Sequence, residues 1–177
     1  MKRTLIIALA MAGYFAAQAQ IADPAAAKKS AFMAAKSMDE AMMNKHYDDY
    51  AAFIHPRVLE NVEGGRAGMT IQVAQQIKDL EESGNLITAV WPNMPETILD
   101  TAGEWQCVLP QYMEYRLPEG KIKATTSLIG LSPDKGKTWY FLDVAGRSLA
   151  EMRTLFPNVS SKLVVPPPVD PQFTADK

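Results

Sequence analysis

The chain has 177 residues, a formal net charge of −2 and a single cysteine. This length suits one ordinary domain. The mild acidity, without a lysine or arginine cluster, argues against nucleic-acid binding, which needs a concentrated positive face, and disfavours anionic membranes for the same reason. With only two histidines and no cysteine–histidine cluster, we expect no metal site and no cofactor.

The first residues have the three-part layout of a secretory signal peptide. Lys2 and Arg3 precede an apolar run over residues 5–17, and Ala-Gln-Ala at 17–19 places small residues where a signal peptidase cleaves. The run is shorter than the roughly 20 residues that span a bilayer, although a retained membrane anchor is the alternative. We predict a signal peptide at 1–19 and a periplasmic or secreted chain without membrane insertion after cleavage. Removal of Lys2 and Arg3 takes the formal charge from −2 to −4.

A long helix and a short one are expected next. Asp23 and Pro24 form a typical helix start, with Asp as the N-cap and Pro at the first helical position. Alanines and methionines then repeat at helical spacing over 25–47, with Asp39 among the charged residues assigned to the solvent side. A second helix over 48–54 must end there, because the residue before Pro56 avoids helical backbone angles.

An extended stretch and a third helix follow. Residues 56–65 read as a short extended stretch closed by a Gly-Gly turn. Apolar residues then mark one face of a helix over 69–83, which Gly84 ends in a left-handed conformation. The residues of this apolar face are Met69, Val73, Ile77 and Leu80.

From Asn85 to Val144 the pattern becomes that of strands. β-Branched and aromatic residues separated by turn residues predict four or five antiparallel strands with short connections. A last helix over 148–156 opens with a capping box formed by Ser148 and Glu151. The order of elements indicates one α+β domain over residues 20–163. The proline-rich tail from Val164 to the end is expected to be extended or disordered rather than part of the core.

The stretch SPDKGKTWYFLD at 132–143 fits the S-x-D-x-G-x-T-W Asp-box of sialidase-type propellers. Mechanically this motif is a β-hairpin, in which Asp134 accepts backbone amides, Gly136 permits a positive φ and Trp139 packs beneath. A propeller needs about six blades with repeated motifs, whereas this chain has one copy and scattered arginines. We therefore predict a structural hairpin rather than a sugar-cleaving enzyme.

The order of elements resembles the nuclear-transport-factor-2-like superfamily, which has the cystatin-like cone fold. In that superfamily a long and a shorter helix precede a His-Pro-like step, here His55-Pro56, and a third helix and a strongly bent sheet follow. DKGKTWYFLD also looks like the D-x-G-x-T-W-x-F hairpin of exported bacterial members. The resemblance implies an α+β fold with three N-terminal helices packed in a strongly curved, cone-shaped antiparallel sheet and a short C-terminal helix. It also implies a conical cavity open at one end.

Candidate site residues are those that face such a cavity. Trp139, Phe141 and Asp143 alternate along the last predicted strand and therefore project from one face. If that face is the inner one, Asp143 is a carboxylate among aromatics, suited to proton transfer as in the ketosteroid isomerases of the superfamily. The alternative is that Asp143 caps the turn near Gly146 or pairs with Arg147.

Three further residues complete the predicted ligand pocket. His55 offers acid–base chemistry near neutral pH, or simply binds the last carbonyls of its helix. Tyr115 either offers its hydroxyl to a ligand or is a plain core tyrosine, and Trp105 is a core or rim aromatic. The best catalytic candidates are Asp143, His55 and Tyr115. Cys107 lies in an apolar run and is predicted to be a buried, inert thiol.

Three functions fit this fold, because a fold alone does not determine function. We predict first a non-catalytic exported domain that binds a small, largely apolar molecule or an envelope protein in the cone. The second is an isomerase, dehydratase or cyclase that uses Asp143 with His55 or Tyr115 as proton donor. The third is a structural module that forms a homodimer through its sheet.

Overall fold

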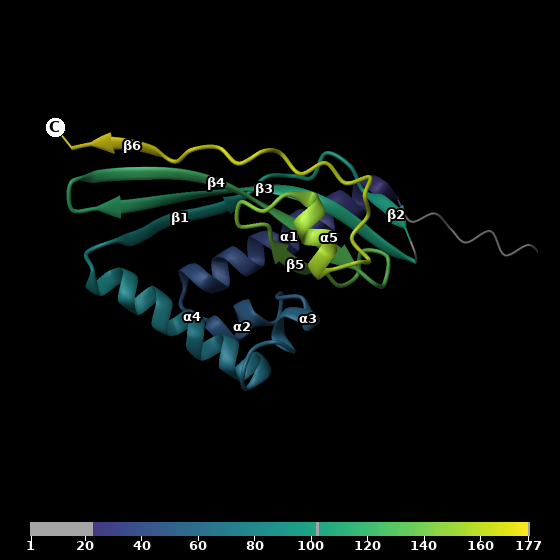
Figure 1. Cartoon of the computed structure of the whole chain (residues 1–177), viewed down its shortest axis with the longest axis horizontal. Coiled ribbons are helices and arrows are strands. Elements are labelled where there is room, and N and C mark those ends of the chain that lie inside the picture. The colour runs from purple at the N-terminus through teal and green to yellow at the C-terminus, as the bar shows by residue number, and fades with distance from the viewer. Residues whose placement is uncertain (1–22, 102, 177) are drawn as a thin grey trace, which may run out of the picture.

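The computed structural model describes residues 23–101 and 103–176, so the predicted signal peptide lies outside the described residues. The described residues form a mixed α+β fold in which several helices accompany a six-stranded antiparallel sheet (Figure 1). The sheet is open rather than closed into a barrel. The predicted α+β class is confirmed at this level.

Four helices precede the sheet in this part of the chain. They are α1 (Pro24–Met43), α2 (Tyr47–Ala51), α3 (Pro56–Leu59) and α4 (Gly65–Glu82). Asp23 caps α1 as expected, since its carboxylate accepts a 2.9 Å hydrogen bond from the amide of Ala25. The prediction of an extended stretch after His55 is wrong. Pro56 is instead the first residue of α3. An N–H at this position would have no partner within the helix, so proline loses no hydrogen bond there.

The antiparallel strands expected between Asn85 and Val144 are present as five strands, and a sixth strand, in the tail, was not predicted. They are β1 (Leu86–Pro92), β2 (Leu99–Thr101), β3 (Glu104–Leu117), β4 (Gly120–Ser132), β5 (Tyr140–Asp143) and β6 (Gln172–Ala175). The long strands β3 and β4 form the central pair, with β1 beside β3 and β5 beside β4. After β5, α5 (Leu149–Leu155) begins with the predicted capping box, in which Ser148 and Glu151 each bond the other's backbone amide.

The tail from Val164 is extended, as predicted, but it remains attached to the fold. It runs along the sheet and ends in β6, which pairs with the first residues of β4 (Figure 1). Arg116 on β3 forms an ion pair with Asp176 next to this strand. Val165 packs against a buried cluster, so the first residues of the tail contribute to the core, which their proline-rich context did not indicate.

Both faces of the sheet are covered by hydrophobic clusters. The first cluster joins α1 to the sheet and includes Ala31, Ala35, Trp105, Leu109, Leu128, Trp139 and Phe141. The second cluster joins α5 and the segment after it to the other face and includes Ile129, Leu131, Leu142, Val144 and Met152. Cys107 belongs to the first cluster, where burial raises the pKa of its thiol to about 12, so the predicted buried, inert thiol is confirmed.

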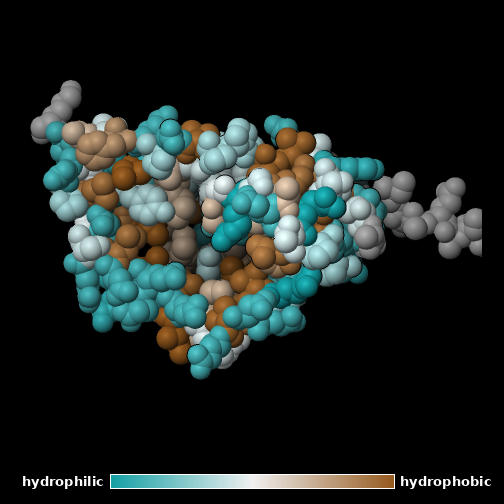
Figure 2. All heavy atoms as spheres, in the orientation of Figure 1, coloured by the Kyte–Doolittle hydropathy of each residue, from teal (hydrophilic) through white to brown (hydrophobic). Residues whose placement is uncertain are grey.

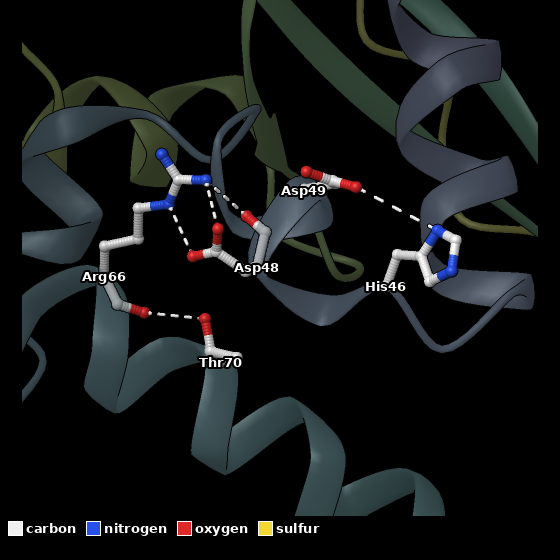
Figure 3. A network of polar contacts seen from close by, with 5 residues as sticks. All are labelled: His46, Asp48, Asp49, Arg66 and Thr70. Carbon is white, nitrogen blue, oxygen red and sulfur yellow. Dashed lines mark hydrogen bonds and ion pairs between the residues drawn. The ribbon is translucent and has the colours of Figure 1, made fainter.

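α4 differs from the other long elements because none of its residues is buried. It packs against α2 and α3. Near its start, Arg66 donates to both carboxylate oxygens of Asp48 (3.0 and 2.9 Å) and to the Asp48 carbonyl (2.7 Å), while His46 lies 4.0 Å from Asp49 nearby (Figure 3). The bidentate contact between Arg66 and Asp48 links α2 to α4, although an exposed ion pair adds little to stability. The predicted apolar face of α4 is thus left half-covered.

Candidate functional site

The register of the sheet determines which polar residues face the helices. Leu109 on β3 belongs to the first cluster, and residues at even spacing from it project from the same face. The pairing carries this face to Leu128 on β4 and to its partner Asp143 on β5. The polar side chains on the helix-facing side of the sheet include Gln111, Tyr115, Thr126 and Asp143.

Asp39 of α1 is the buried carboxyl opposite this face. It is 1% exposed, and its Oδ1 accepts a 2.6 Å hydrogen bond from Nε2 of Gln111. Its Oδ2 is buried without a hydrogen-bond partner among the described residues. Burial raises the pKa of Asp39 from 3.8 to about 7, against the lowering effect of the Gln111 hydrogen bond and with a smaller contribution from Glu40. Asp39 can therefore take up or release a proton near neutral pH.

Two tyrosines are affected by the carboxyl groups on this side of the sheet, Tyr50 by Asp143 and Asp39 and Tyr115 by Asp143 alone. Tyr50 of α2 packs against the first cluster, and burial, with the charges of Asp143 and Asp39, raises the pKa of its hydroxyl to about 12. Burial and then the charge of Asp143 also raise the pKa of Tyr115, whose hydroxyl donates to the sulfur of Met113 at 3.4 Å. Both hydroxyls thus keep their protons at neutral pH. The helix-facing side brings two carboxyls and two tyrosine donors into one region.

Asp143 is exposed and caps a turn, which is the alternative to a catalytic role that the sequence offered. Its Oδ1 accepts hydrogen bonds from the hydroxyl of Thr126 (3.0 Å) and the amide of Ala145 (2.9 Å). Ala145 has a φ of +49°, a left-handed conformation that a non-glycine residue rarely adopts, so the cap holds a strained turn. These contacts account for Asp143 without a catalytic role.

The structure does not bring His55 to Asp143. Nδ1 of His55 accepts a 3.2 Å hydrogen bond from the amide of Arg57, so the side chain caps α3 rather than the end of the preceding helix. Its ring packs edge-on against Tyr140 and Phe156, at centroid distances of 6.2 and 5.7 Å. Tyr140 projects from the face of β5 opposite to Asp143. Partial burial lowers the pKa of His55, and the residue has a structural place outside the helix-facing site.

Three residues of the predicted ligand pocket fill the core instead. Trp105, Trp139 and Phe141 are 5%, 3% and 1% exposed, and all belong to the first cluster. The indole N–H of Trp139 donates to the hydroxyl of Ser30 on α1 (2.9 Å), and that of Trp105 donates to Asp100 (3.2 Å). These contacts hold α1 and β2 against the central strands, so the aromatics have a packing role.

The Asp-box stretch forms the predicted structural turn. Oδ1 of Asp134 accepts hydrogen bonds from the hydroxyl of Ser132 (3.0 Å) and from the amides of Lys137 (3.1 Å) and Thr138 (2.7 Å). Burial acts in the opposite direction, but these hydrogen bonds together hold the pKa of Asp134 below its usual value. Gly136 adopts a φ of +90°. The motif residues build the turn that places Trp139 in the core.

Gly136→Ala is expected to destabilise the protein more than Gly103→Ala. The two glycines have φ values of +90° and +89°, so either alanine is forced into a strained backbone that costs about 1 kcal/mol. A Cβ at Gly136 would also lie 2.9 Å from the ring of Trp105, whereas nothing lies within 4 Å of a Cβ at Gly103. Urea denaturation should show an additional loss of about 1–3 kcal/mol for Gly136→Ala. Equal losses would mean that the Trp105 ring moves aside freely.

The molecular surface is hollowed on the helix-facing side of the sheet. The space-filling view shows a recess between the sheet and the exposed polar side of α4, with apolar residues along it (Figure 2). A cavity of ≈ 40 Å³ separates α4 from α1 and β1, and its apolar lining consists of Met42, Met43, Ile77, Leu80 and Ile87. The half-covered apolar face of α4 therefore borders a small cavity rather than a packed core.

Asp39, the most buried acid of the site, was misassigned from the sequence. Its neighbours Glu40 and Lys36 suggested a solvent-facing stripe. The available signal was the four-residue spacing from Ala31 and Ala35, both fully buried, which places Asp39 on the same helix face.

Within the described ranges, no group of three or more His, Cys, Asp or Glu side chains is arranged to hold a metal ion. No helix in residues 23–101 or 103–176 is long and apolar enough to cross a membrane. Comparison with known proteins assigns no family, because no protein-family model and no curated protein matches the chain.

Proposed function

We propose that the chain binds a small, largely apolar molecule between its helices and its sheet, with Asp39 as the polar group that the molecule engages. The proposal retains the cone of the nuclear-transport-factor-2-like superfamily, in which helices and a curved sheet enclose a tapered recess. The observation that carries it is the unpartnered Oδ2 of Asp39, buried on the side of α1 that faces the sheet.

A buried carboxyl oxygen without a partner is costly, and folded proteins satisfy nearly all such atoms. An alanine at position 39, together with an apolar residue in place of Gln111, would continue the apolar stripe of Ala31 and Ala35 and would avoid that cost. Asp39 is therefore better explained by a task than by packing. A hydroxyl or amide of a bound molecule would supply the missing hydrogen bond.

The surroundings favour a ligand that is otherwise apolar. The apolar face of α4 is only half-buried, and the recess beside it is bordered by apolar residues (Figure 2). Small-molecule sites are typically apolar hollows of about 300 Å³ or more with a few placed polar groups, so a ligand here requires α4 to move outward and enlarge the ≈ 40 Å³ cavity. Tyr50, whose pKa is affected by Asp39, would add a hydroxyl donor in such a site.

Proton transfer is the second candidate function, and one observation favours it. The pKa of Asp39 lies at about 7, because burial outweighs its hydrogen bond from Gln111, and an acid with such a pKa suits general acid–base catalysis at neutral pH. Asp39 would then take the part that the sequence assigned to Asp143, with Tyr50 as the proton donor in place of His55.

Thermal-shift screening of sterols, fatty acids and aromatic metabolites tests the proposal. A ligand at one hundred times its Kd is expected to stabilise the wild type by about 2.7 kcal/mol and to raise Tm. Asp39→Asn should weaken that ligand by about tenfold or more, because the carboxyl contact is lost. Asp49→Asn, which removes an exposed carboxyl on α2, is the matched control and should bind normally. Equal binding by Asp39→Asn and wild type would contradict the proposal.

A further inference from the structure

A groove lies on the face of the sheet opposite to α1, toward the end of the sheet formed by β1 and β6. Trp91 on β1 and Tyr112 on β3 are partners across these strands, and Tyr112 projects opposite to Gln111, which bonds Asp39. Side chains of β1, β3, β4 and the tail enclose a volume of ≈ 310 Å³. The lining residues used below are Trp91, Tyr112, Lys123, Thr125, Asp170 and Gln172.

A stacked pair of aromatic side chains lines the groove. The rings of Trp91 and Tyr112 are stacked, with centroids 5.6 Å apart and planes 18° apart. Nδ2 of Asn93 donates a 3.3 Å hydrogen bond to the Tyr112 hydroxyl, which helps to fix that ring. Trp91 is 41% exposed, whereas Trp105 and Trp139 are buried. An ordered indole with an open surface binds a flat apolar partner with little loss of side-chain entropy.

The rim of the groove is polar but offers no available positive charge. Lys123, the one basic residue among those that line it, is engaged by Glu114 at 3.0 Å. Asp170 on the tail is exposed and forms no ion pair within the described residues. Thr125 and Gln172 add a hydroxyl and an amide, which can both donate and accept. An anionic ligand would meet the Asp170 carboxylate, whereas neutral hydroxyls would find both donors and acceptors.

We propose that this groove binds a neutral saccharide, with one face of a pyranose ring on Trp91 and its hydroxyls bonded to Asp170, Gln172 and Thr125. A pyranose ring carries C–H groups on its faces and hydroxyls around its edge, which complements stacked aromatic rings with a polar rim. The groove has the volume of a small-molecule site, about 300 Å³ or more. It is independent of the Asp39 site, because the sheet lies between them.

The test is an NMR titration of the indole N–H resonances of the three tryptophans in the purified protein. Cellohexaose and chitohexaose are the neutral probes, and hexagalacturonate is the anionic comparison. At least one neutral probe is expected to shift the Trp91 resonance and to leave those of Trp105 and Trp139 unchanged. Both variants lack the Trp91 resonance, so their affinities for the same probe are measured by isothermal titration calorimetry. Trp91→Ala should weaken binding about tenfold or more, and Trp91→Phe, which keeps an aromatic ring, should retain part of it.

Phe173→Ala is the matched control, because Phe173 on β6 is 54% exposed and does not line the groove. Unchanged Trp105 and Trp139 resonances show that each variant is folded. The proposal is overturned if neither neutral probe shifts Trp91, or if hexagalacturonate shifts it as strongly. It is also overturned if the Trp91 resonance changes with protein concentration alone, because a second copy then covers the groove.

Discussion

The free energy of unfolding is expected to fall as the pH rises from about 4 to about 7, by up to about 4 kcal/mol. The cause is Asp39, whose pKa is raised by burial from 3.8 to about 7. Between these two values the folded protein holds a proton on Asp39 and the unfolded chain does not. Unfolding therefore releases a proton, and rising pH favours it. Most carboxyl groups have the opposite effect, because salt bridges and hydrogen bonds lower their pKa in the folded state.

Urea denaturation at about pH 5 and about pH 8 should show about 3 kcal/mol of this fall, because the rest occurs below pH 5, and Asp39→Asn is the control. The variant should lack the fall, because an amide does not titrate. His55 acts in the other direction: burial lowers its pKa, so its contribution is present above the unfolded value of 6.5 and is lost as the pH falls. Asp39→Asn should therefore show a small rise with pH. Parallel profiles for wild type and variant would show that Asp39 does not hold this proton.

Phe141→Ala is expected to lower the free energy of unfolding by about 3–5 kcal/mol, the range for a large aromatic residue in a core. Phe141 is 1% exposed, and its ring lies over Gly130, where an added Cβ would be 3.2 Å away. Its amide donates to the carbonyl of Phe53 (2.8 Å), and its carbonyl accepts from the amide of His55 (3.2 Å). These bonds hold the backbone in place, so the surroundings cannot collapse into the cavity that alanine would leave.

Urea denaturation of Phe141→Ala, beside the exposed control Phe173→Ala, measures this effect. The control should lose less than about 1 kcal/mol. The folded fraction of Phe141→Ala should still bind the ligand that depends on Asp39, because Phe141 acts through packing. A variant that is stable but unable to bind would instead place Phe141 in the ligand pocket, as the sequence suggested.

Local signals in the sequence predicted much of the fold. The Asp23 cap, the Ser148–Glu151 capping box and the Asp134 turn each depend on residues within a few positions of one another. Alternation along one strand also predicted that Trp139 and Phe141 share a face of the sheet, and both belong to the first cluster. These features need no knowledge of distant parts of the chain.

The predictions were wrong where contacts between distant parts of the chain determine the position of a side chain. His55 was paired with Asp143 because both are titratable, but the packing of Tyr140 and Phe156 places it elsewhere. Asp39 was placed on the solvent side by its charge, although its helix face is set by Ala31 and Ala35. Sequence analysis expects charged residues on the exposed side of a helix. Exceptions to such rules concentrate at functional sites.

β6 also has a consequence for the behaviour of the protein in concentrated solution. The unpaired edge of a strand presents backbone hydrogen-bond donors and acceptors, and strands of other molecules can pair with them. β6 pairs with this edge of β4 over Gly120–Lys123, and β5 pairs with the same edge further along the strand. The outermost strand there is then β6, and because it has only four residues it offers a strand of another molecule few backbone groups to pair with.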